Sequence, residues 1–452
     1  MHPLNRGQRE IFLFVLAWCI SVIGSAFGGT TSHIQQSEAF YDRKDYQKAL
    51  EELDKLDPPT SGTPDARRLR IRILLRLGNP KEALTNYDQL AQVLKHEDPP
   101  ILREISLGFV LALTKDMREQ MRGAAYTALK DWHSSESIPY LEDGLSDGSG
   151  LVRALAAEGL AKLDEGRRSV RFRKALEDQA VLVKEAVLKG LAKSDDTSVI
   201  PLVEPALKDR EVRVRIAAAE VLCHLNRPKG CELLLQYAKA PNPDERTSAI
   251  RALVDRQSSE VLSILLESSE HKQPSVRGAA ATGFAHVPTA EAVTALTRLL
   301  KDPLPPVRIA AAVSFGQLHG FDTRTPLHGA LNDRDLPVRA FVIGAVLEQG
   351  ERYEVVTDAV QTLTGAKEPA VRAAVARALG HAAESNLDPA QSALMLLVQD
   401  TVPRVRIAAI KSMAKIGGVS AIPLLKQSLH DEDDAVRATA GGALLKLVPP
   451  KE

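Results

Sequence analysis

Three groups of residues have types and spacings that could support chemistry. Gly144-Leu-Ser-Asp-Gly148 matches the Gly-x-Ser-x-Gly pattern that presents a nucleophilic serine in a tight turn. Cys223 and Cys231, with His224 beside the first, offer two thiols and an imidazole that could bind a metal ion, and the thiols could instead pair as a disulfide. His96-Glu97 offers an imidazole and a carboxylate, both of which ligate iron in proteins. Whether any of these groups acts depends on the elements predicted around it.

The elements predicted around these residues do not suit catalysis. A serine elbow needs a strand before it and a helix after it, whereas Gly144–Gly148 falls in a turn between two predicted helices. The cysteines and His224 lack the close-spaced pairs of a zinc site, so a disulfide and two buried thiols remain the alternatives. The His-Glu-x-x-His and Gly-rich phosphate-loop patterns are absent from the sequence. We therefore predict that the chain is not an enzyme and has no cofactor and no catalytic, cofactor-binding or metal-binding residues.

The composition argues against other classes of protein. The chain has 452 residues with 58 Lys and Arg against 58 Asp and Glu, so its formal net charge is zero. Proteins that bind nucleic acid or anionic membranes usually show a basic excess, and we predict no nucleic-acid partner. Hydrophobic residues make up 44% of the chain but aromatic residues only 4%. This balance favours closely packed helices with small side chains at their contacts.

The N-terminal segment has the order of a secretory signal peptide. Arg6 and Arg9 flank the start of the apolar run Ile11–Ile23, and the small residues of Gly24–Gly29 follow it. We predict that residues 1–28 form a signal peptide or an N-terminal anchor, with cleavage favoured because the apolar run is shorter than the ~20 residues of a spanning helix. The protein is then expected to be exported to the bacterial periplasm or cell envelope. It contacts a membrane only if residues 11–27 are retained as an anchor.

A basic residue, usually preceded by Val, recurs at a fixed interval through most of the chain. The step is 31 residues up to Arg339, then 33, 34 and again 31. The eleven positions are Arg122, Arg153, Lys184, Arg215, Arg246, Arg277, Arg308, Arg339, Arg372, Arg406 and Arg437. Val152, Ala156, Leu160 and Leu163 share one face of a helix, and a second apolar segment precedes each such helix. This period is typical of stacked helical hairpins, so we predict an all-α fold, a right-handed α-α superhelix or solenoid.

Each copy resembles the HEAT repeat. An apolar helix, Leu-x-Asp, a short Pro- and Asp-rich turn and Val-Arg-x-x-Ala-Ala follow in that family's order, and the length resembles its phycobilisome-lyase variety, an armadillo-like helical fold. An Asp lies six residues before the basic residue in most copies: Asp116, Asp147, Asp178, Asp209, Asp302, Asp333, Asp400 and Asp431. Ala240, His271 and Ala366 take its place elsewhere, which predicts softer junctions there. We assign residues 99–449 to a HEAT-like array.

Stacking predicts a structural role for the repeated Asp and Arg. Equivalent residues of neighbouring hairpins come together in a stack, and an Asp at a turn can accept from an Arg at a helix start and also cap the helix. The resemblance implies that these residues form a ladder inside the stack. We therefore expect Asp302→Ala or Arg308→Ala to lower thermal stability and to leave ligand affinity largely unchanged.

A second, shorter repeat precedes the array. Ala49 and Ala83 lie in matching Lys-Ala-Leu and Glu-Ala-Leu sequences 34 residues apart, and the Pro- and Gly-rich segment Asp57–Pro64 connects the two copies. The pattern resembles the tetratricopeptide repeat, a helix pair in which the small Ala allows close packing. We assign residues 33–98 to tetratricopeptide-like repeats and expect Ile101–Lys115 to continue the stack.

Function is expected where the copies differ. The second helix of each hairpin should line the concave surface of a solenoid. The residues six past each Val-equivalent are expected to face it: Thr127, Glu158, Lys189, Glu220, Arg251, Thr282, Val313, Gly344, Arg377, Lys411 and Gly442. They are mixed in charge and contain no aromatic residue, which argues against a phosphate-binding stripe. We predict a non-catalytic scaffold or adaptor that binds a protein or an extended peptide there. The resemblance leaves a lyase-like or cofactor-maturation enzyme as the alternative.

Three further features bear on partners. Additional residues near Gln349–Tyr353 and His381–Asp388 lengthen the repeat step, and inserted loops of solenoids often carry specificity. Val448–Glu452 directly follows a repeat helix with little polar cap. Because an uncapped end of a stack can associate with another, an end-to-end dimer is an additional expectation.

Overall fold

The computed structural model describes residues 33–254 and 258–450, which form helices joined by turns. No strand occurs in these ranges, so the predicted all-α fold is confirmed. The chain divides into two compact units: one runs to Ala112 and includes the residues from Pro449, and the other is Leu113–Val448. The predicted signal peptide or anchor lies outside the described residues. Within them, no helix has both the length and the apolar character needed to cross a membrane.

The first unit packs helices in pairs. They are residues 33–42, α2 (Tyr46–Leu53), α3 (Pro58–Ser61), α4 (Pro64–Arg76), α5 (Pro80–Leu94) and nearly all of α6 (Pro99–Leu113). Ala49 and Ala83 are fully buried, as expected where helices approach closely. The Ser37 hydroxyl donates to the Ala49 carbonyl oxygen at 2.7 Å and ties the first helix to α2. The tetratricopeptide-like assignment itself stays a prediction, and its boundary after residue 98 lies one helix before the division between the units.

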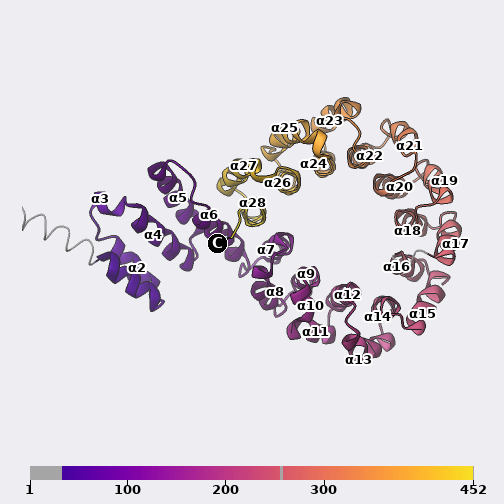
Figure 1. Cartoon of the computed structure of the whole chain (residues 1–452), viewed down its shortest axis with the longest axis horizontal. Helices are drawn as coiled ribbons and strands as arrows, with labels where there is room; N and C mark the ends of the chain where they lie inside the picture. Colours follow the sequence, from indigo (N-terminus) through magenta and orange to yellow (C-terminus); the bar gives the residue numbers. More distant parts are fainter. Residues whose placement is uncertain (1–32, 255–257, 451–452) are drawn as a thin grey trace, which may run out of the picture. The chain divides into compact units, whose positions relative to one another are not determined.

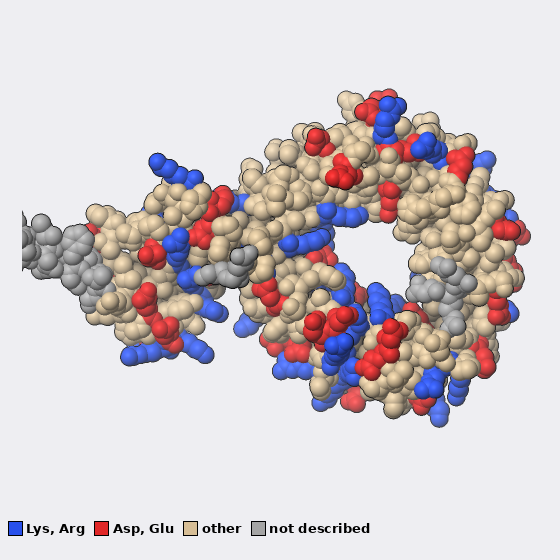
Figure 2. All heavy atoms as spheres, viewed as in Figure 1, with Lys and Arg blue, Asp and Glu red and all other residues tan. Residues whose placement is uncertain are grey.

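The second unit is a curved stack of helical hairpins, whose inner helices carry the Val-Arg motif or its equivalent (Figure 1) and surround a central opening (Figure 2). The inner helices are α7 (Glu119–Trp132), α9 (Gly150–Ala161), α12 (Val181–Leu191), α14 (Val212–His224), α16 (Pro243–Leu253), α18 (Pro274–Phe284), α20 (Pro305–Gln317), α22 (Leu336–Glu348), α24 (Pro369–Leu379), α26 (Pro403–Ile416) and α28 (Asp434–Leu447). The outer helices are α8 (Ile138–Gly144), α10 (Asp164–Arg168), α11 (Val170–Lys174), α13 (Ile200–Val203), α15 (Pro228–Ala238), α17 (Ser259–Ser268), α19 (Ala290–Leu299), α21 (Arg324–Ala330), α23 (Thr357–Thr364), α25 (Leu387–Val398) and α27 (Ile422–Gln427). This arrangement confirms the predicted superhelical solenoid.

Small side chains bring the helices of the second unit close together. In α9, Val152, Ala156 and Leu160 are fully buried, which matches the predicted apolar face. Gly159 lies so close to the outer helix α8 that a Cβ atom there would come within 2.6 Å of the Leu141 side chain. The Ser149 side chain caps α9 by accepting from the backbone N–H groups of the first turn. Each repeat therefore adds its own section to one hydrophobic core that extends along the stack.

The second unit closes on itself. Its last helix, α28, packs against its first inner helix, α7 (Figure 1). Gly442 permits the close approach, because a Cβ atom there would lie 2.9 Å from the Cβ atom of Ala128. Lys411 Nζ and Asp131 Oδ2 form an ion pair at 2.9 Å on the same side. The end of the stack that was expected to pair with a second chain is thus covered by α7 of the same chain.

A disulfide bond joins one hairpin internally. Cys223 in α14 is bonded to Cys231 in α15, with their Cα atoms 4.6 Å apart. The sequence permits either a disulfide or two buried thiols, and the structure shows the disulfide. His224 instead lies 3.1 Å from an oxygen of Asp195.

Candidate functional site

The repeated Arg (or Lys) and Asp residues form a ladder that joins most of the neighbouring hairpins. Arg153 donates from Nε and Nη2 to the carboxylate of Asp178, at 2.7 and 2.8 Å, and from Nη1 to the backbone oxygen of Asp147 at 2.8 Å. The Asp178 carboxylate also accepts from the Ala180 N–H at 2.7 Å, which holds the turn before the next helix. The same ion pair recurs at Arg122–Asp147, Arg153–Asp178, Lys184–Asp209, Arg277–Asp302, Arg308–Asp333, Arg372–Asp400 and Arg406–Asp431. The predicted structural ladder is confirmed.

Three junctions lack the ladder carboxylate, as the sequence predicted. Arg215 donates to the Tyr237 hydroxyl at 3.1 Å, since Ala240 stands in the place of the Asp. At the next junction the Asp is replaced by His271, and Arg246 pairs with Glu267 on α17 instead. Its buried Nε atom has no hydrogen-bond partner among the described residues. At the third, Arg339 donates to the backbone oxygen of Asp333.

Asp147 and Glu97, which belong to the two candidate catalytic motifs Gly144–Gly148 and His96-Glu97, make structural hydrogen bonds. Asp147, within Gly144–Gly148, accepts from Arg122 at 2.7 Å, and the segment is a turn between α8 and α9 rather than a strand-to-helix elbow. The Glu97 carboxylate accepts from the Tyr87 hydroxyl at 2.6 Å. Within the described ranges, no group of three or more His, Cys, Asp or Glu side chains is placed to hold a metal ion.

The two loops that lengthen the repeat step are bound to the stack. Gln349 donates from its amide to three backbone oxygens at the end of α20, at 2.7 to 3.0 Å. Asn386, which is buried, accepts from the Tyr353 N–H at 3.0 Å and donates to the Glu351 backbone oxygen at 2.6 Å. These hydrogen bonds give both loops a structural role, and a role in specificity remains a prediction.

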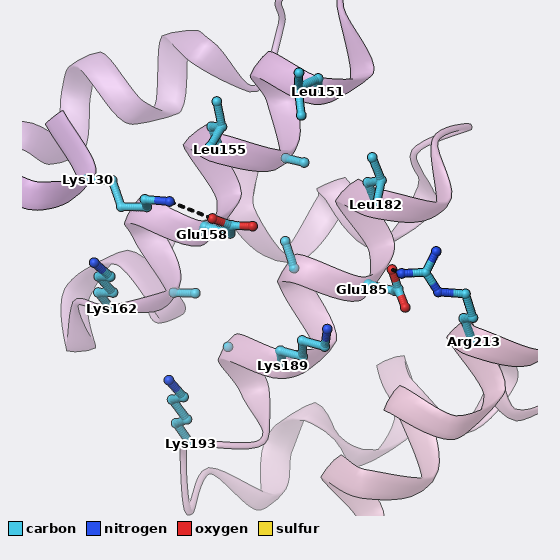
Figure 3. Close-up of a pocket in the computed structure, with 14 residues that line it drawn as sticks. Lys130, Leu151, Leu155, Glu158, Lys162, Leu182, Glu185, Lys189, Lys193 and Arg213 are labelled. Atoms are coloured by element: carbon cyan, nitrogen blue, oxygen red, sulfur yellow. Dashed lines mark hydrogen bonds and ion pairs between the residues drawn. The ribbon is translucent and has the colours of Figure 1, made fainter. Parts of the chain in front are cut away.

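A pocket of about 360 Å³ lies on the concave side of α7, α9, α12 and α14. Figure 3 shows its side chains in three rows along the inner helices. Leu151 and Leu182 lie at one edge, near the starts of α9 and α12, and Leu155 lies beside them one turn further along α9. Glu158 and Glu185 lie in the middle row. The pocket therefore combines an apolar edge with a charged floor.

Both glutamates of the pocket are already paired. Glu158 accepts from Lys130 Nζ at 2.8 Å, and Glu185 pairs with Arg213 at 2.8 Å. The ion pairs neutralise these carboxylates and hold them across neighbouring inner helices. The remaining charges of the pocket all belong to lysines.

Three lysines form the opposite edge of the pocket: Lys162, Lys189 and Lys193 (Figure 3). All three are exposed, and Lys189 and Lys193 have no ion-pair partner in the part of the chain that the structure describes. Lys162 lies 3.8 Å from Asp131. Partial shielding of the Lys162 ammonium from water lowers its pKa; Asp131 opposes this effect, whereas Lys130 and Lys193 reinforce it. A cluster of like charges of this kind favours an anionic ligand.

The basic edge continues across the closure between α28 and α7. A second cavity of about 370 Å³ shares Lys162 with the first and is also lined by Lys411, Lys415 and Lys446. Asp131 is the acidic residue of this cavity, between Lys162 and Lys411. Figure 2 shows Lys and Arg side chains along the opening near α7, α9, α12 and α26, with fewer charged side chains near α20 and α22. We call Lys162, Lys189, Lys193, Lys411, Lys415 and Lys446 the basic concave surface.

The largest of the described cavities belongs to the ladder. It measures about 610 Å³ and is lined by Asp302, Arg308 and Asp333 near the turns between inner and outer helices. Arg308 and Asp333 form one ion pair, and Asp302 accepts from Arg277. These three side chains are therefore engaged with one another or with Arg277 within the stack.

The sequence identified only part of the concave surface. Lys189 and Lys411, which lie six residues past their Val-equivalents, line the two basic cavities as predicted. The row ten residues past the Val-equivalent was missed, although it contains Lys162, Lys193, Lys415 and Lys446. It lies four residues, about one helical turn, beyond the first row and so shares its face. The lysines of this second row are the signal in the sequence that predicts the basic concave surface.

Comparisons with known proteins agree with this architecture. The family model for HEAT repeats matches residues 170–254, 200–282, 262–348 and 356–445. Comparison with curated protein sequences gives no significant match.

Solved structures of similar fold include the complex of CpcE and CpcF of phycocyanin lyase from Nostoc sp. PCC7120. It is 18% identical, covers 47% of this chain and 92% of its own, and has a TM-score of 0.34. Kap121p is 13% identical, covers 91% of this chain and 56% of its own, and has a TM-score of 0.37. Kap121p bound to Nup53p is also 13% identical, covers 93% and 53%, and has a TM-score of 0.36. At these identities the similarity concerns the fold alone.

Proposed function

Since the chain belongs to the HEAT-repeat family, we propose that it is a non-catalytic scaffold or adaptor that binds another protein, or an extended segment of one, on the concave surface of its second unit. The observation that carries this proposal is that the charges of the ladder are paired with one another, whereas several lysines of the concave surface are not paired within the described residues. The Arg–Asp ladder is paired within the stack, whereas Lys189 and Lys193 face the central opening without partners in the described chain. Extended concave surfaces are what solenoids use for binding.

We also propose that the protein acts outside the cytoplasm, in the periplasm or cell envelope. The Cys223–Cys231 disulfide supports this location, because disulfides persist in oxidising compartments and are rare in reducing ones. The basic, apolar and small-residue order of the first 28 residues supports export. Fractionation of cells that express the full chain, with an antibody to the second unit, tests this part of the proposal.

Site-specific photo-crosslinking in intact cells tests the binding surface. p-Benzoylphenylalanine replaces Thr282 on the inner helix α18 in one variant and Thr294 on the outer helix α19 in the other; both threonines are exposed. The proposal predicts a discrete protein adduct from position 282 and none from position 294. The same adducts from both positions, or adducts only from position 294, would contradict binding on the concave surface.

A further inference from the structure

We propose that the bound segment is an acidic peptide with interspersed apolar side chains, and that it lies on the basic concave surface and the adjacent leucine edge of the first pocket. This inference rests on the proposed function and specifies the chemistry of the partner. It follows from the order of side chains across α9 and α12 and from the charge of the surface that continues over the closure.

The apolar edge requires a partner with apolar side chains. Leu151 and Leu182 are 50% and 45% exposed, at equivalent places near the starts of adjacent inner helices. Leu155 lies beside them in the same pocket (Figure 3). Covering such side chains removes apolar area from water, and this burial favours binding. Two exposed leucines one repeat apart would therefore hold apolar residues of an extended segment along the stack.

The basic edge requires carboxylates on the partner. In the first pocket five basic side chains face two glutamates, and Lys130 and Arg213 are paired with those glutamates. Lys189 and Lys193 then remain for a ligand, and Lys162 shares the single carboxylate of Asp131 with Lys411. In the neighbouring cavity Asp131 contacts Lys411, while Lys415 and Lys446 have no ion-pair partner in the described ranges. The successive carboxylates of an acidic peptide along this surface could therefore each lie close to a lysine ammonium group.

The same surface is poorly suited to nucleic acid. Neither basic cavity has a Phe, Tyr or Trp side chain in its lining. Base stacking on aromatic side chains is the usual source of affinity for single strands. An acidic peptide needs no such platform and uses the leucine edge that a nucleic acid would leave uncovered.

The test measures fluorescence anisotropy of labelled peptides with the purified full chain. The binding probe is a peptide of Glu-Leu-Glu-Gly repeats, and the comparison peptides are Lys-Leu-Lys-Gly and Glu-Ser-Glu-Gly repeats of equal length. Labelled oligothymidylate is the nucleic-acid arm. We expect saturable binding of the Glu-Leu peptide that weakens with added salt, weaker binding of the Glu-Ser peptide and no binding of the Lys-Leu peptide.

Matched variants locate the site. Lys189→Glu with Lys193→Glu should weaken binding of the Glu-Leu peptide by roughly tenfold or more, because two attractive charges become repulsive. The control is Lys208→Glu with Lys301→Glu, which makes the same change in net charge at exposed outer positions. Leu151→Ser should reduce affinity for the Glu-Leu peptide and leave the Glu-Ser peptide unaffected, while Leu396→Ser, on the outer helix α25, should change neither.

Each contrary result overturns the inference. Equal binding of the Lys-Leu peptide, equal loss in both lysine double variants, or tighter binding of oligothymidylate than of the Glu-Leu peptide would refute an acidic-peptide site. If position 282 crosslinks a protein while the Glu-Leu peptide does not bind, the inference fails and the scaffold proposal stands. If position 282 gives no adduct and the Glu-Leu peptide does not bind either, the scaffold proposal itself fails.

Discussion

Arg153 of one hairpin donates two hydrogen bonds to the carboxylate of Asp178 in the next, at 2.7 and 2.8 Å. The relationship repeats along the second unit and explains why an Arg and an Asp recur at the same register of the sequence. Because the pair is bidentate and largely shielded from water, it joins neighbouring repeats and is not available to bind a ligand. The residues that face the central opening are free to vary.

Removing a ladder residue should destabilise the stack without affecting binding. In Asp302→Ala or Arg308→Ala, one side chain of a shielded ion pair loses its partner, which costs about 3 kcal/mol. The side chains of Asp302 and Arg308 are only 6% and 5% exposed. Thermal unfolding followed by circular dichroism checks the stability, with Lys301→Ala on the exposed neighbouring residue as control. An unchanged melting temperature in both ladder variants would refute the structural role.

Acid should weaken the same contacts. The hydrogen bonds from Arg153, Lys184 and Arg372 lower the pKa values of Asp178, Asp209 and Asp400. A carboxyl whose pKa is lower in the folded state stabilises the fold above its unfolded pKa, and this stabilisation is lost as pH falls through the folded value.

We therefore expect the urea midpoint to drop as pH falls below about 4, the ordinary pKa of an aspartate. Urea titrations at a series of pH values provide the measurement. A midpoint that rises on acidification would contradict the sign of this linkage.

His271→Asp should stabilise the protein by supplying a missing part of the ladder. His271 already occupies the place of the ladder Asp, and its ring accepts from the Gln273 N–H at 3.1 Å, as Asp302 accepts from Leu304. An Asp there could also accept from the buried Nε atom of Arg246, which lacks a partner within the described residues. We expect a gain of about 1 to 2 kcal/mol in the free energy of unfolding. His271→Asn, which adds no charge, is the control and should give a smaller gain.

The closure between α28 and α7 should open when Gly442 is enlarged. A Cβ atom at Gly442 already meets Ala128 at 2.9 Å, so Gly442→Leu cannot fit without separating the helices. Small-angle X-ray scattering should show a larger radius of gyration for this variant. Gly278→Leu is the matched control, since nothing lies within 4 Å of a Cβ atom there. Equal radii for the two variants would contradict a tight closure.

The closure is also the place where the ladder ends. Arg437, in the last repeat, pairs with Asp434 of its own helix, and Asp116, before the first inner helix, pairs with Arg118 at 2.8 Å. Arg118 in turn reaches Asp434 at 3.3 Å. At the closure, the Arg–Asp pairing of the ladder is therefore replaced by a different set of contacts, which the repeat pattern does not predict.

The sequence predicts the ladder contacts well, but it does not predict the closure or the full set of concave lysines. The period places Arg153 and Asp178 one repeat apart at stacked turns, so their contact follows from the helical hairpin alone. Closure does not follow, because it depends on small rotations at each junction that accumulate over the stack. The positions six residues past each Val-equivalent do not predict Lys162 and Lys193, which lie four residues further along the same helical face. The sequence does not decide whether Cys223 and Cys231 pair, since a separation of eight residues across a turn permits both free thiols and the disulfide that the structure shows.

The most direct measurement is the dissociation constant of the protein recovered by crosslinking from position 282. It is compared among the unmodified chain, Arg308→Ala, and Lys189→Glu with Lys193→Glu, at a temperature where all three are folded. We predict that the ladder variant binds as tightly as the unmodified chain despite its lower melting temperature, and that the lysine variant binds roughly tenfold or more weakly. Loss of binding in Arg308→Ala at an unchanged melting temperature, with full binding in the lysine variant, would contradict the account.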